Sequence, residues 1–266
     1  MRPIMFRFGD LALHSYGVFL AIGFLYGITL ATKEARRLGQ DPEKMLDLSF
    51  WVLIGAIAGA RLFHCMVYWE DYIHQPLEIL KIWKGGLTFY GGFILAMLFV
   101  IAFIWRYKLP ALTWMDAMSP ALMLGITFGR MGCFNAGCCY GKPTSVPWGV
   151  VFNQSQGLAT KGIALHPTQL YQGLANFSIF LIIMGMRKHK RFEGQPFYLT
   201  IVLYSILRSF IEIFRADPRG FVHVFGMPVS ESQLVSAIIG PLALIALVYQ
   251  TWKHRKGAEP LEAQTA

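Results

Sequence analysis

The chain has few charged residues for its length, and acidic residues are the scarcer kind. Asp, Glu, Lys and Arg make up only 15% of the 266 residues, whereas an average soluble domain contains roughly a quarter. There are 15 acidic residues against 24 Lys and Arg. So low a charge content excludes an ordinary water-soluble globular protein of this size.

Two other common features are also missing. The sequence contains no internal repeat and no low-complexity segment. Its opening residues, 1–7, lack an apolar stretch followed by a small-residue cleavage site, so no cleaved signal peptide is expected. The first apolar segment is therefore expected to act as its own insertion signal.

Apolar sequence is abundant instead. Hydrophobic residues make up 55% of the chain, and its mean hydropathy is +0.46. A helix needs roughly 20 apolar residues to cross a bilayer. Seven stretches of about this length are expected to be transmembrane helices: 11–32, 46–68, 87–105, 111–129, 169–186, 196–214 and 232–251. We therefore predict an all-α polytopic membrane protein that forms a single integral domain over residues 1–266.

The basic residues gather in alternate loops of this predicted bundle, around 33–44, 106–108, 187–191 and 253–256. Loops rich in Lys and Arg stay in the cytoplasm. This pattern predicts an N-terminus outside, a cytoplasmic C-terminus, and an outer loop region at about 130–168. It also explains the net charge of +9 without a nucleic acid partner. The polar end of the chain, 257–266, is expected to be a short disordered tail.

Two arginines lie where lipid would disfavour them. Arg130 ends one apolar stretch, and Arg208 lies inside another. A charge within a lipid-spanning segment costs roughly a few kcal/mol, so it almost always faces a polar cavity. Planar guanidinium groups bind phosphate with two parallel hydrogen bonds. The pair predicts a cavity for a phosphate-bearing molecule.

The second of these arginines belongs to a longer polar pattern. Tyr204, Arg208, Glu212 and Arg215 follow at intervals of four, four and three, which places them on one helical face. A buried Arg–Glu pair is the structural alternative, but such pairs stabilise proteins poorly. We therefore favour a functional interpretation.

The stretch 46–68 carries both small and polar residues. Gly55 and Gly59 lie four apart, a spacing that permits close helix packing. Arg61 and His64 lie three apart and so share a face. For Arg61, a side chain that reaches out to the membrane surface is the alternative to a role in the site.

Two further polar residues are open to a structural interpretation. Tyr16 fits either a pocket or the belt of aromatic residues at a membrane surface. Asp116 is expected at the cytoplasmic interface.

Three of the four cysteines, Cys133, Cys138 and Cys139, fall in the predicted outer loop. A structural zinc site needs four ligands, and only the distant His166 is available as a fourth. We therefore expect a disulfide or free thiols, with no metal and no cofactor.

Four separated motifs, in matching order and spacing, resemble the prolipoprotein diacylglyceryl transferase family. They are the segments 86–92, 129–134, 166–171 and 204–215, and the resemblance extends from Tyr16 to Gln233. That family moves a diacylglyceryl group from phosphatidylglycerol to the lipobox cysteine of a prolipoprotein, which forms a thioether and releases glycerol phosphate. The resemblance implies a bacterial cytoplasmic (inner) membrane protein with its active site towards the outer leaflet.

The resemblance and the polar patterns together predict the site. Catalytic roles are expected for Arg130, Arg208, Tyr90, Glu212 and Tyr204. Substrate contacts are expected for Tyr16, Arg61, Gly141, His166 and Arg215.

Three positions depart from the family's most familiar form. Tyr90 stands where a His is usual, Cys133 where an Asn is usual, and Cys138 where a Glu is usual. The general base is therefore open between His64 and His166. Alternatively, nearby positive charge lowers the pKa of the substrate thiol enough that no dedicated base is needed.

The expected partners are phosphatidylglycerol, prolipoprotein signal peptides with a lipobox cysteine, and the bilayer. Three alternatives remain: a membrane thiol–redox protein, a transporter of an anionic solute, and a paralogue with another acceptor. The first does not explain the face that carries Arg208. The second requires a pathway open to both sides, whereas the polar residues lie towards the predicted outer ends of their spans.

Overall fold

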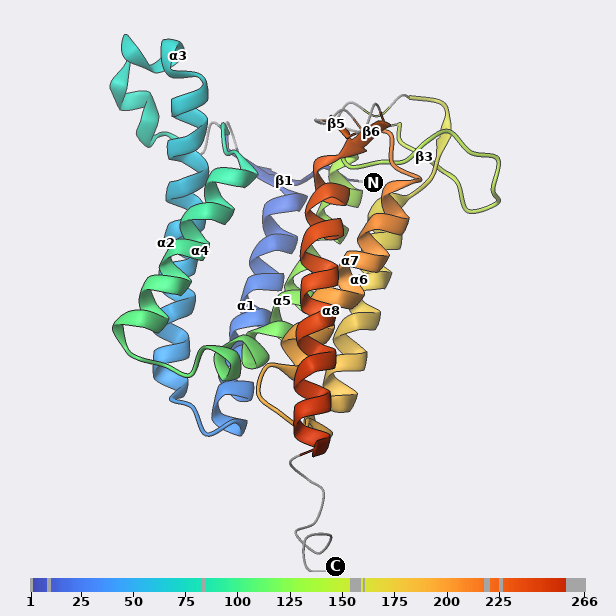
Figure 1. Ribbon diagram of the computed structural model, residues 1–266. Helices are drawn as coiled ribbons and strands as arrows, with labels where there is room; N and C mark the ends of the chain where they lie inside the picture. Colours follow the sequence, from blue (N-terminus) through green and yellow to red (C-terminus); the bar gives the residue numbers. More distant parts are fainter. Residues whose placement is uncertain are drawn as a thin grey trace, which may run out of the picture. The chain divides into compact units, whose positions relative to one another are not determined.

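The computed structural model describes residues 2–8, 11–82, 85–153, 159, 161–217, 221–224 and 227–256. The described chain is mostly helical, with three short antiparallel strand pairs (Figure 1). It divides into two compact units, which are treated separately below. The first unit comprises Met1–Ala31 and Met115–Ala266, and the second comprises Thr32–Trp114.

Every predicted apolar stretch overlaps a helix for most of its length. These helices are α1 (Ser15–Arg37), α2 (Pro42–Val67), α4 (Phe89–Arg106), α5 (Ala111–Ala136), α6 (Thr168–Met186), α7 (Gln195–Glu212) and α8 (Glu231–Lys256). Within the described residues, five of them (α1, α2, α4, α6 and α8) are long and apolar enough to cross a membrane. The more polar α5 and α7 carry Arg130 and Arg208. The all-α membrane fold is confirmed, while the number of seven spans and their orientation stay predictions.

The first predicted span begins four residues too early. Strands β1 (Ile4–Phe8) and β2 (Leu11–His14) form an antiparallel pair, and α1 starts at Ser15. The Ser15 backbone N–H donates to the Pro3 carbonyl over 2.9 Å, and its hydroxyl donates to the Arg2 carbonyl. Residues 11–14 satisfy their backbone groups in this strand pair, so the apolar run does not continue the helix.

In the second unit, α2 and α4 pack together through glycines (Figure 1). A Cβ added to Gly59 would overlap the Gly91 carbonyl oxygen and would lie 2.6 Å from the Leu95 Cβ. One added to Gly55 would lie 2.5 Å from the Phe99 ring. The predicted close packing of this small-residue face is therefore confirmed. Two short helices, α3 (Trp69–Ile73) and η1 (Pro76–Leu80), follow α2.

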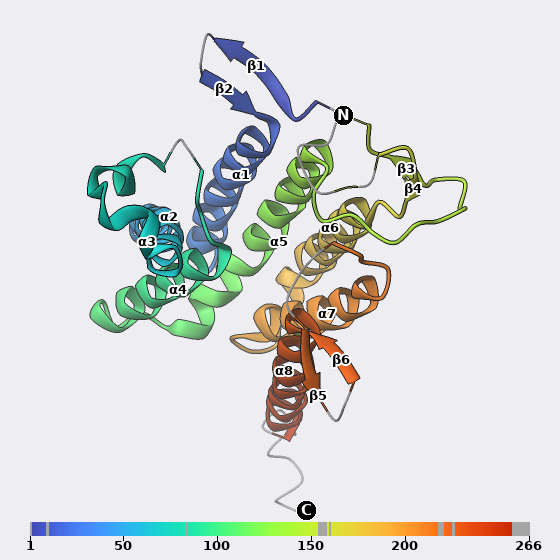
Figure 2. The same ribbon diagram turned by 90° about the horizontal axis from the view of Figure 1, so that it is seen from above.

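In the first unit, α5, α6 and α7 share an apolar core. Met123, Ile179 and Ile183 are buried there, and leucines of α7 pack against them. The last helix, α8, lies beside α7 (Figure 2), where a Cβ on Gly240 would lie 2.9 Å from the Ser205 Cβ. Helix α1 packs on α5 where the rings of Tyr26 and Phe128 stack with centroids 5.6 Å apart.

Asp116 is buried within the protein, and its place at the cytoplasmic interface stays a prediction. The residue is 4% exposed. Its carboxylate accepts hydrogen bonds from the backbone N–H groups of Gly194 and Phe197 at 2.8 and 3.1 Å. Lys190 adds an ion pair at 3.1 Å. Because the first N–H groups of a helix lack internal partners, Asp116 binds the start of α7 to α5. The short helix η3 (Arg187–His189) precedes this connection.

The long connection after α5 begins later than predicted. Helix α5 continues to Ala136, so the loop starts at Gly137 rather than near residue 130. It contains the strand pair β3 (Val150–Val151) and β4 (Ala164–Leu165) and a small core around Phe152. A third pair, β5 (Phe221–Val224) and β6 (Met227–Ser230), precedes α8. The predicted tail lies outside the described residues.

The glycine contact between α2 and α4 makes a stability prediction. Gly59→Ala would force the two backbones apart, so we expect a loss of about 1–3 kcal/mol, typical of overpacking. Thermal unfolding in detergent measures this loss. Gly17→Ala in α1 is the control, because no atom lies within 4 Å of an added Cβ there. Equal unfolding temperatures for the two variants would contradict the packing argument.

Candidate active site

Arg130 lies within α5 rather than at its end, since the helix continues for six more residues. Its side chain is half-buried. A Cβ added to Gly173 of α6 would lie 3.7 Å from the Arg130 Cβ, so α5 and α6 meet at this point. Among the described residues, none forms a hydrogen bond or ion pair with the Arg130 guanidinium, and its charge is therefore available to an anion.

Arg208 and Glu212 form the buried pair predicted from their spacing. They are 7% and 8% exposed, and one terminal nitrogen of Arg208 is bonded to a Glu212 carboxylate oxygen. The other terminal nitrogen donates to the Ser232 hydroxyl at 2.9 Å. Tyr204, one turn earlier, packs beside the apolar core of α5 and α6. Glu212 and Ser232 thus fix the Arg208 guanidinium from two helices.

Arg215 does not share that helical face, and the prediction that it does is wrong. Helix α7 ends at Glu212, and Arg215 forms an antiparallel bridge with Gly141. Its Nε and a terminal nitrogen donate to the two Asp217 carboxylate oxygens at 3.0 and 2.9 Å. This paired guanidinium therefore enters the site from a loop.

Gly141 joins three segments of backbone. Its N–H donates to the His166 carbonyl at 2.9 Å, and the next N–H, of Lys142, donates to the Phe214 carbonyl at 2.8 Å. A Cβ on Gly141 would lie 2.6 Å from both the His166 Cβ and the Phe214 carbonyl oxygen. Only glycine fits this approach, which gives Gly141 a role in assembling the site.

His166 belongs to an aromatic cluster. Its Nδ1 lies 3.1 Å from the Tyr171 hydroxyl, which also accepts a hydrogen bond from Trp148 Nε1 at 2.7 Å. The ring packs edge-on against Phe214 at a centroid distance of 5.2 Å. These contacts fix the orientation of the imidazole ring.

The arginines of the first unit share one electrostatic environment. Arg208 lies within range of the charges of Arg215 and Arg130. Tyr16 also lies within range of Arg130, and its backbone packs on Gly132, where an added Cβ would lie 3.2 Å from the Tyr16 Cα. Arg208 and Arg215 are paired with Glu212 and Asp217, so among the described residues the charge of Arg130 is in excess.

A buried polar row on α6 was not predicted from the sequence. Gln169, Gln172 and Asn176 are 1%, 2% and 0% exposed, and Gln172 Nε2 donates to the Asn176 Oδ1 at 3.2 Å. The Gln172 Oε1 and Asn176 Nδ2 have no partner among the described residues. Their helical spacing of three and four within an apolar stretch was the available signal. Gly173, the residue that meets Arg130, lies on the same face.

Two predicted site residues belong to the second unit. Tyr90 lies in the first turn of α4 and is 50% exposed. Arg61 is 6% exposed, which rules out the alternative that its side chain reaches the membrane surface.

The Arg61 guanidinium binds backbone carbonyls instead. Its Nε donates to Ile79 at 2.8 Å, and its terminal nitrogens donate to Glu78 at 2.5 Å, Gly85 at 2.8 Å and Gly86 at 3.1 Å. His64 also borders Gly86, where an added Cβ would lie 2.7 Å from its Nε2. Arg61 therefore holds η1 and the start of the α4 segment on α2.

Five helices long and apolar enough to cross a membrane, among the described residues, define a polytopic membrane protein, and the arginines of its first unit form a candidate anion site. Residues 3–249 match the prolipoprotein diacylglyceryl transferase family, and the chain belongs to that family. The resemblance noted in the sequence is thereby confirmed.

Several phosphatidylglycerol–prolipoprotein diacylglyceryl transferases are similar over most of their length. The Clostridium tetani protein is 33% identical over 89% of this chain and 92% of its own. The Nitrosomonas europaea protein is 34% identical over 98% and 93%, and the Geobacter sulfurreducens protein is 31% identical over 97% of both.

The Arg61 contacts predict a local loss of order in Arg61→Lys. A lysine ammonium cannot reproduce the planar fork that spans these carbonyls. Backbone amide hydrogen exchange in η1 and at the start of α4 is therefore expected to accelerate, while α8 remains unchanged. Arg36→Lys, at an exposed position, is the control. Wild-type exchange rates in Arg61→Lys would disprove the clamp.

Proposed function

We propose that this protein transfers the diacylglyceryl group of phosphatidylglycerol to a cysteine thiol of a prolipoprotein. Membership of the family carries this proposal, and the similar proteins are named for these two substrates. The acceptor we propose is the lipobox cysteine of the signal peptide.

The reaction sets two chemical requirements. The acceptor sulfur attacks a glyceryl carbon, a C–S bond forms, and the bond from that carbon to the phosphate oxygen breaks. The electron pair leaves with glycerol phosphate, and the thiol proton is lost before or during attack. The site must therefore stabilise a phosphate leaving group and favour a thiolate.

Arg130 and Arg208 meet the first requirement in our proposal. Arg208 is oriented by Glu212 and Ser232, and fixed donors cost no rearrangement when charge develops. Arg130 has no partner among the described residues, and a phosphodiester carries the single negative charge that balances the excess. We assign these two guanidinium groups to the phosphate, with Glu212 as a positioning residue.

The guanidinium groups of the site also address the second requirement. A cysteine thiol has a pKa near about 8.5, and nearby guanidinium groups lower the pKa of a thiol. We therefore infer that the acceptor loses its proton without a dedicated imidazole base, because His166 is already fixed against Tyr171. Tyr90 and Tyr204 remain proposed catalytic residues, and Tyr16 and His166 proposed substrate contacts.

The membrane placement is also part of the proposal. Basic residues in alternate loops support seven spans with the N-terminus outside and the C-terminus in the cytoplasm. This arrangement places Gly137, Gly141 and His166 on the outer side. The site would then open to the outer leaflet of a bacterial cytoplasmic membrane, where exported prolipoproteins arrive.

The proposed phosphate contacts predict the effect of Arg208→Lys and Arg130→Lys. Each keeps a charge but loses the bidentate geometry, so kcat is expected to fall by about 100-fold, as when one transition-state donor is removed. The measurement is diacylglyceryl transfer from phosphatidylglycerol to a lipobox peptide, followed by mass spectrometry.

Arg255→Lys, at an exposed position on α8, is the matched control and should keep wild-type turnover. Thermal unfolding of each variant separates loss of chemistry from loss of fold. Near-normal turnover by folded Arg208→Lys would exclude the phosphate role.

The buried amides of α6 predict a second effect on turnover. We propose that Gln172 and Asn176 bind the glycerol or ester oxygens of the lipid, because one polar atom of each has no partner among the described residues. In Gln172→Leu/Asn176→Leu, the KM for phosphatidylglycerol is expected to rise about tenfold, the effect of losing roughly 1.4 kcal/mol of binding. Thermal stability should be kept, because both partners of their mutual hydrogen bond are replaced together. An unchanged KM would refute this role.

A further inference from the structure

A helix end brings two cysteines together. The Gly137 N–H donates to the Phe134 carbonyl and the Cys138 N–H donates to the Cys133 carbonyl, at 3.3 and 3.2 Å, while Gly137 adopts a φ of 73°. This is the Schellman arrangement, in which the residue after the glycine contacts the helix residue five positions earlier. Cys133 and Cys138 occupy those two positions.

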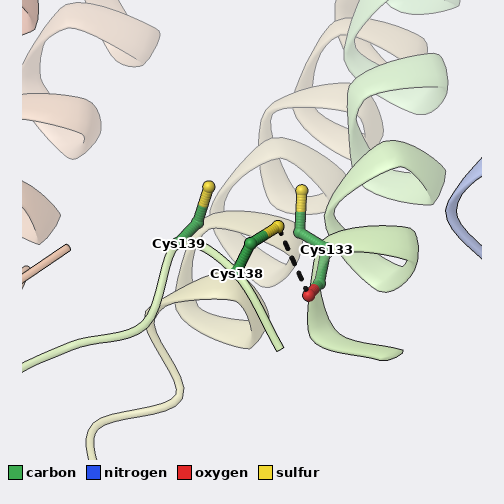
Figure 3. Close-up of side chains that lie close together, drawn as sticks. All are labelled: Cys133, Cys138 and Cys139. Atoms are coloured by element: carbon green, nitrogen blue, oxygen red, sulfur yellow. Dashed lines mark hydrogen bonds between the residues drawn. The ribbon is translucent and has the colours of Figure 1, made fainter. Parts of the chain in front are cut away.

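The third cysteine is turned back towards this pair. Cys139 has a φ of 60°, a conformation that costs a non-glycine residue of order 1–3 kcal/mol and that clusters at functional sites. The loop is fixed by α6, because Gln169 donates to the Cys138 carbonyl and Thr168 to the Cys139 carbonyl, both at 2.7 Å. The three sulfur atoms lie within 4.8 Å of one another, and Figure 3 shows the three side chains gathered at the end of α5.

The surroundings favour a negative charge on one of these sulfurs. The neighbouring Cys133 and Cys138 thiols, together with the charges of Arg130 and Arg215, outweigh the effect of burial and lower the pKa of Cys139 below its ordinary value. Cys138 and Cys139 are half-buried, so they are not sealed from solvent. Reactive cysteines are found in such electropositive, partly exposed places.

We propose that Cys133, Cys138 and Cys139 form a thiol–disulfide exchange site beside Arg130, with Cys139 as the attacking thiolate and Cys133 as the resolving thiol. Its substrate is a disulfide, either of a small thiol or of a cysteine peptide capped by one. Cys138 lies beside Cys139 in sequence, and a disulfide between adjacent cysteines is strained, so Cys138 is not the resolving thiol. Its thiol donates a hydrogen bond to the Cys133 carbonyl at 3.8 Å.

The exchange balances without an additional oxidant. The Cys139 thiolate attacks one sulfur of the substrate disulfide, a new S–S bond forms, and the other half leaves as a thiolate. The Cys133 thiol then loses its proton and attacks the Cys139 sulfur, which forms the Cys133–Cys139 disulfide and releases the second half. Cys133 and Cys139 are oxidised, and the substrate is reduced to two thiols.

The same geometry disfavours a metal ion. Arg130 and Arg215 would repel a cation, and a soft metal needs deprotonated thiols, whereas the Cys138 thiol donates a hydrogen bond to the Cys133 carbonyl at 3.8 Å. A neutral disulfide next to two guanidinium groups carries no such penalty. The charges therefore select exchange chemistry over coordination.

The test is the reaction of the full-length protein in detergent with oxidised glutathione, in the presence of a chelator. Loss of free thiols is followed by alkylation and mass spectrometry. The wild type is expected to form an intramolecular disulfide within 131–142. It should react at least about tenfold faster than an ordinary thiol, of which only a few per cent is ionised at pH 7.

Single substitutions assign the roles. Cys138→Ser should still form the disulfide, Cys133→Ser should stop at glutathione attached to Cys139, and Cys139→Ser should lose the fast reaction. Cys65→Ser in α2 is the matched control and should behave as the wild type. Iodoacetamide labelling of the unaltered protein, with Cys139 modified first, provides the same assignment without any variant.

A second arm uses a lipobox peptide whose cysteine carries glutathione. Release of the free peptide thiol would identify the acceptor as a substrate of the exchange, and this arm rests on the proposed function. Because no lipid is present, the result is independent of transferase activity. Slow reaction of Cys139 with both disulfides, or the same rate in Cys139→Ser, would overturn the proposal.

Discussion

A guanidinium group inside an apolar helix bundle needs compensation, and the way each arginine obtains it determines the architecture. Arg61 is satisfied by backbone carbonyls, Arg208 by Glu212 and Ser232, and Arg215 by Asp217. Each arginine binds a different segment of the chain, and these contacts hold loops and helix ends in place. Arg130 is left without such a partner among the described residues, so the bundle holds one charge that a ligand must complete.

The helices and the Arg208–Glu212 pair were predictable, because apolar length and a spacing of four are local properties of the sequence. The position of Arg215 was not, because the helix stops at Glu212 and the backbone pairing with Gly141 involves residues more than 70 positions apart. The burial of Asp116 was not predictable for a similar reason, since its N–H donors lie 78 and 81 positions later in the sequence. The local sequence pattern identifies the charged side chains, while tertiary contacts determine which partners they bind.

The cysteine cluster and the proposed phosphate site depend on the same arginine. A thiolate at Cys139 lies in the field of Arg130, and so would a lipid phosphate in our proposal. The two anions would compete for one positive charge, whereas a disulfide would leave that charge free. If both proposals hold, simple electrostatics couples phosphatidylglycerol binding to the redox state of the loop.

The Arg61 clamp has a consequence for how the chain is made. The carbonyl groups that Arg61 binds lie 17 to 25 residues later in the sequence, beyond the end of α2. While α2 is leaving the ribosome, those acceptors have not yet been synthesised or still lie inside the exit tunnel. Arg61 must therefore stay hydrated, either at the membrane surface or with water around it inside the membrane, until the downstream loop has been synthesised. Biogenesis of this bundle is in this respect ordered by one side chain.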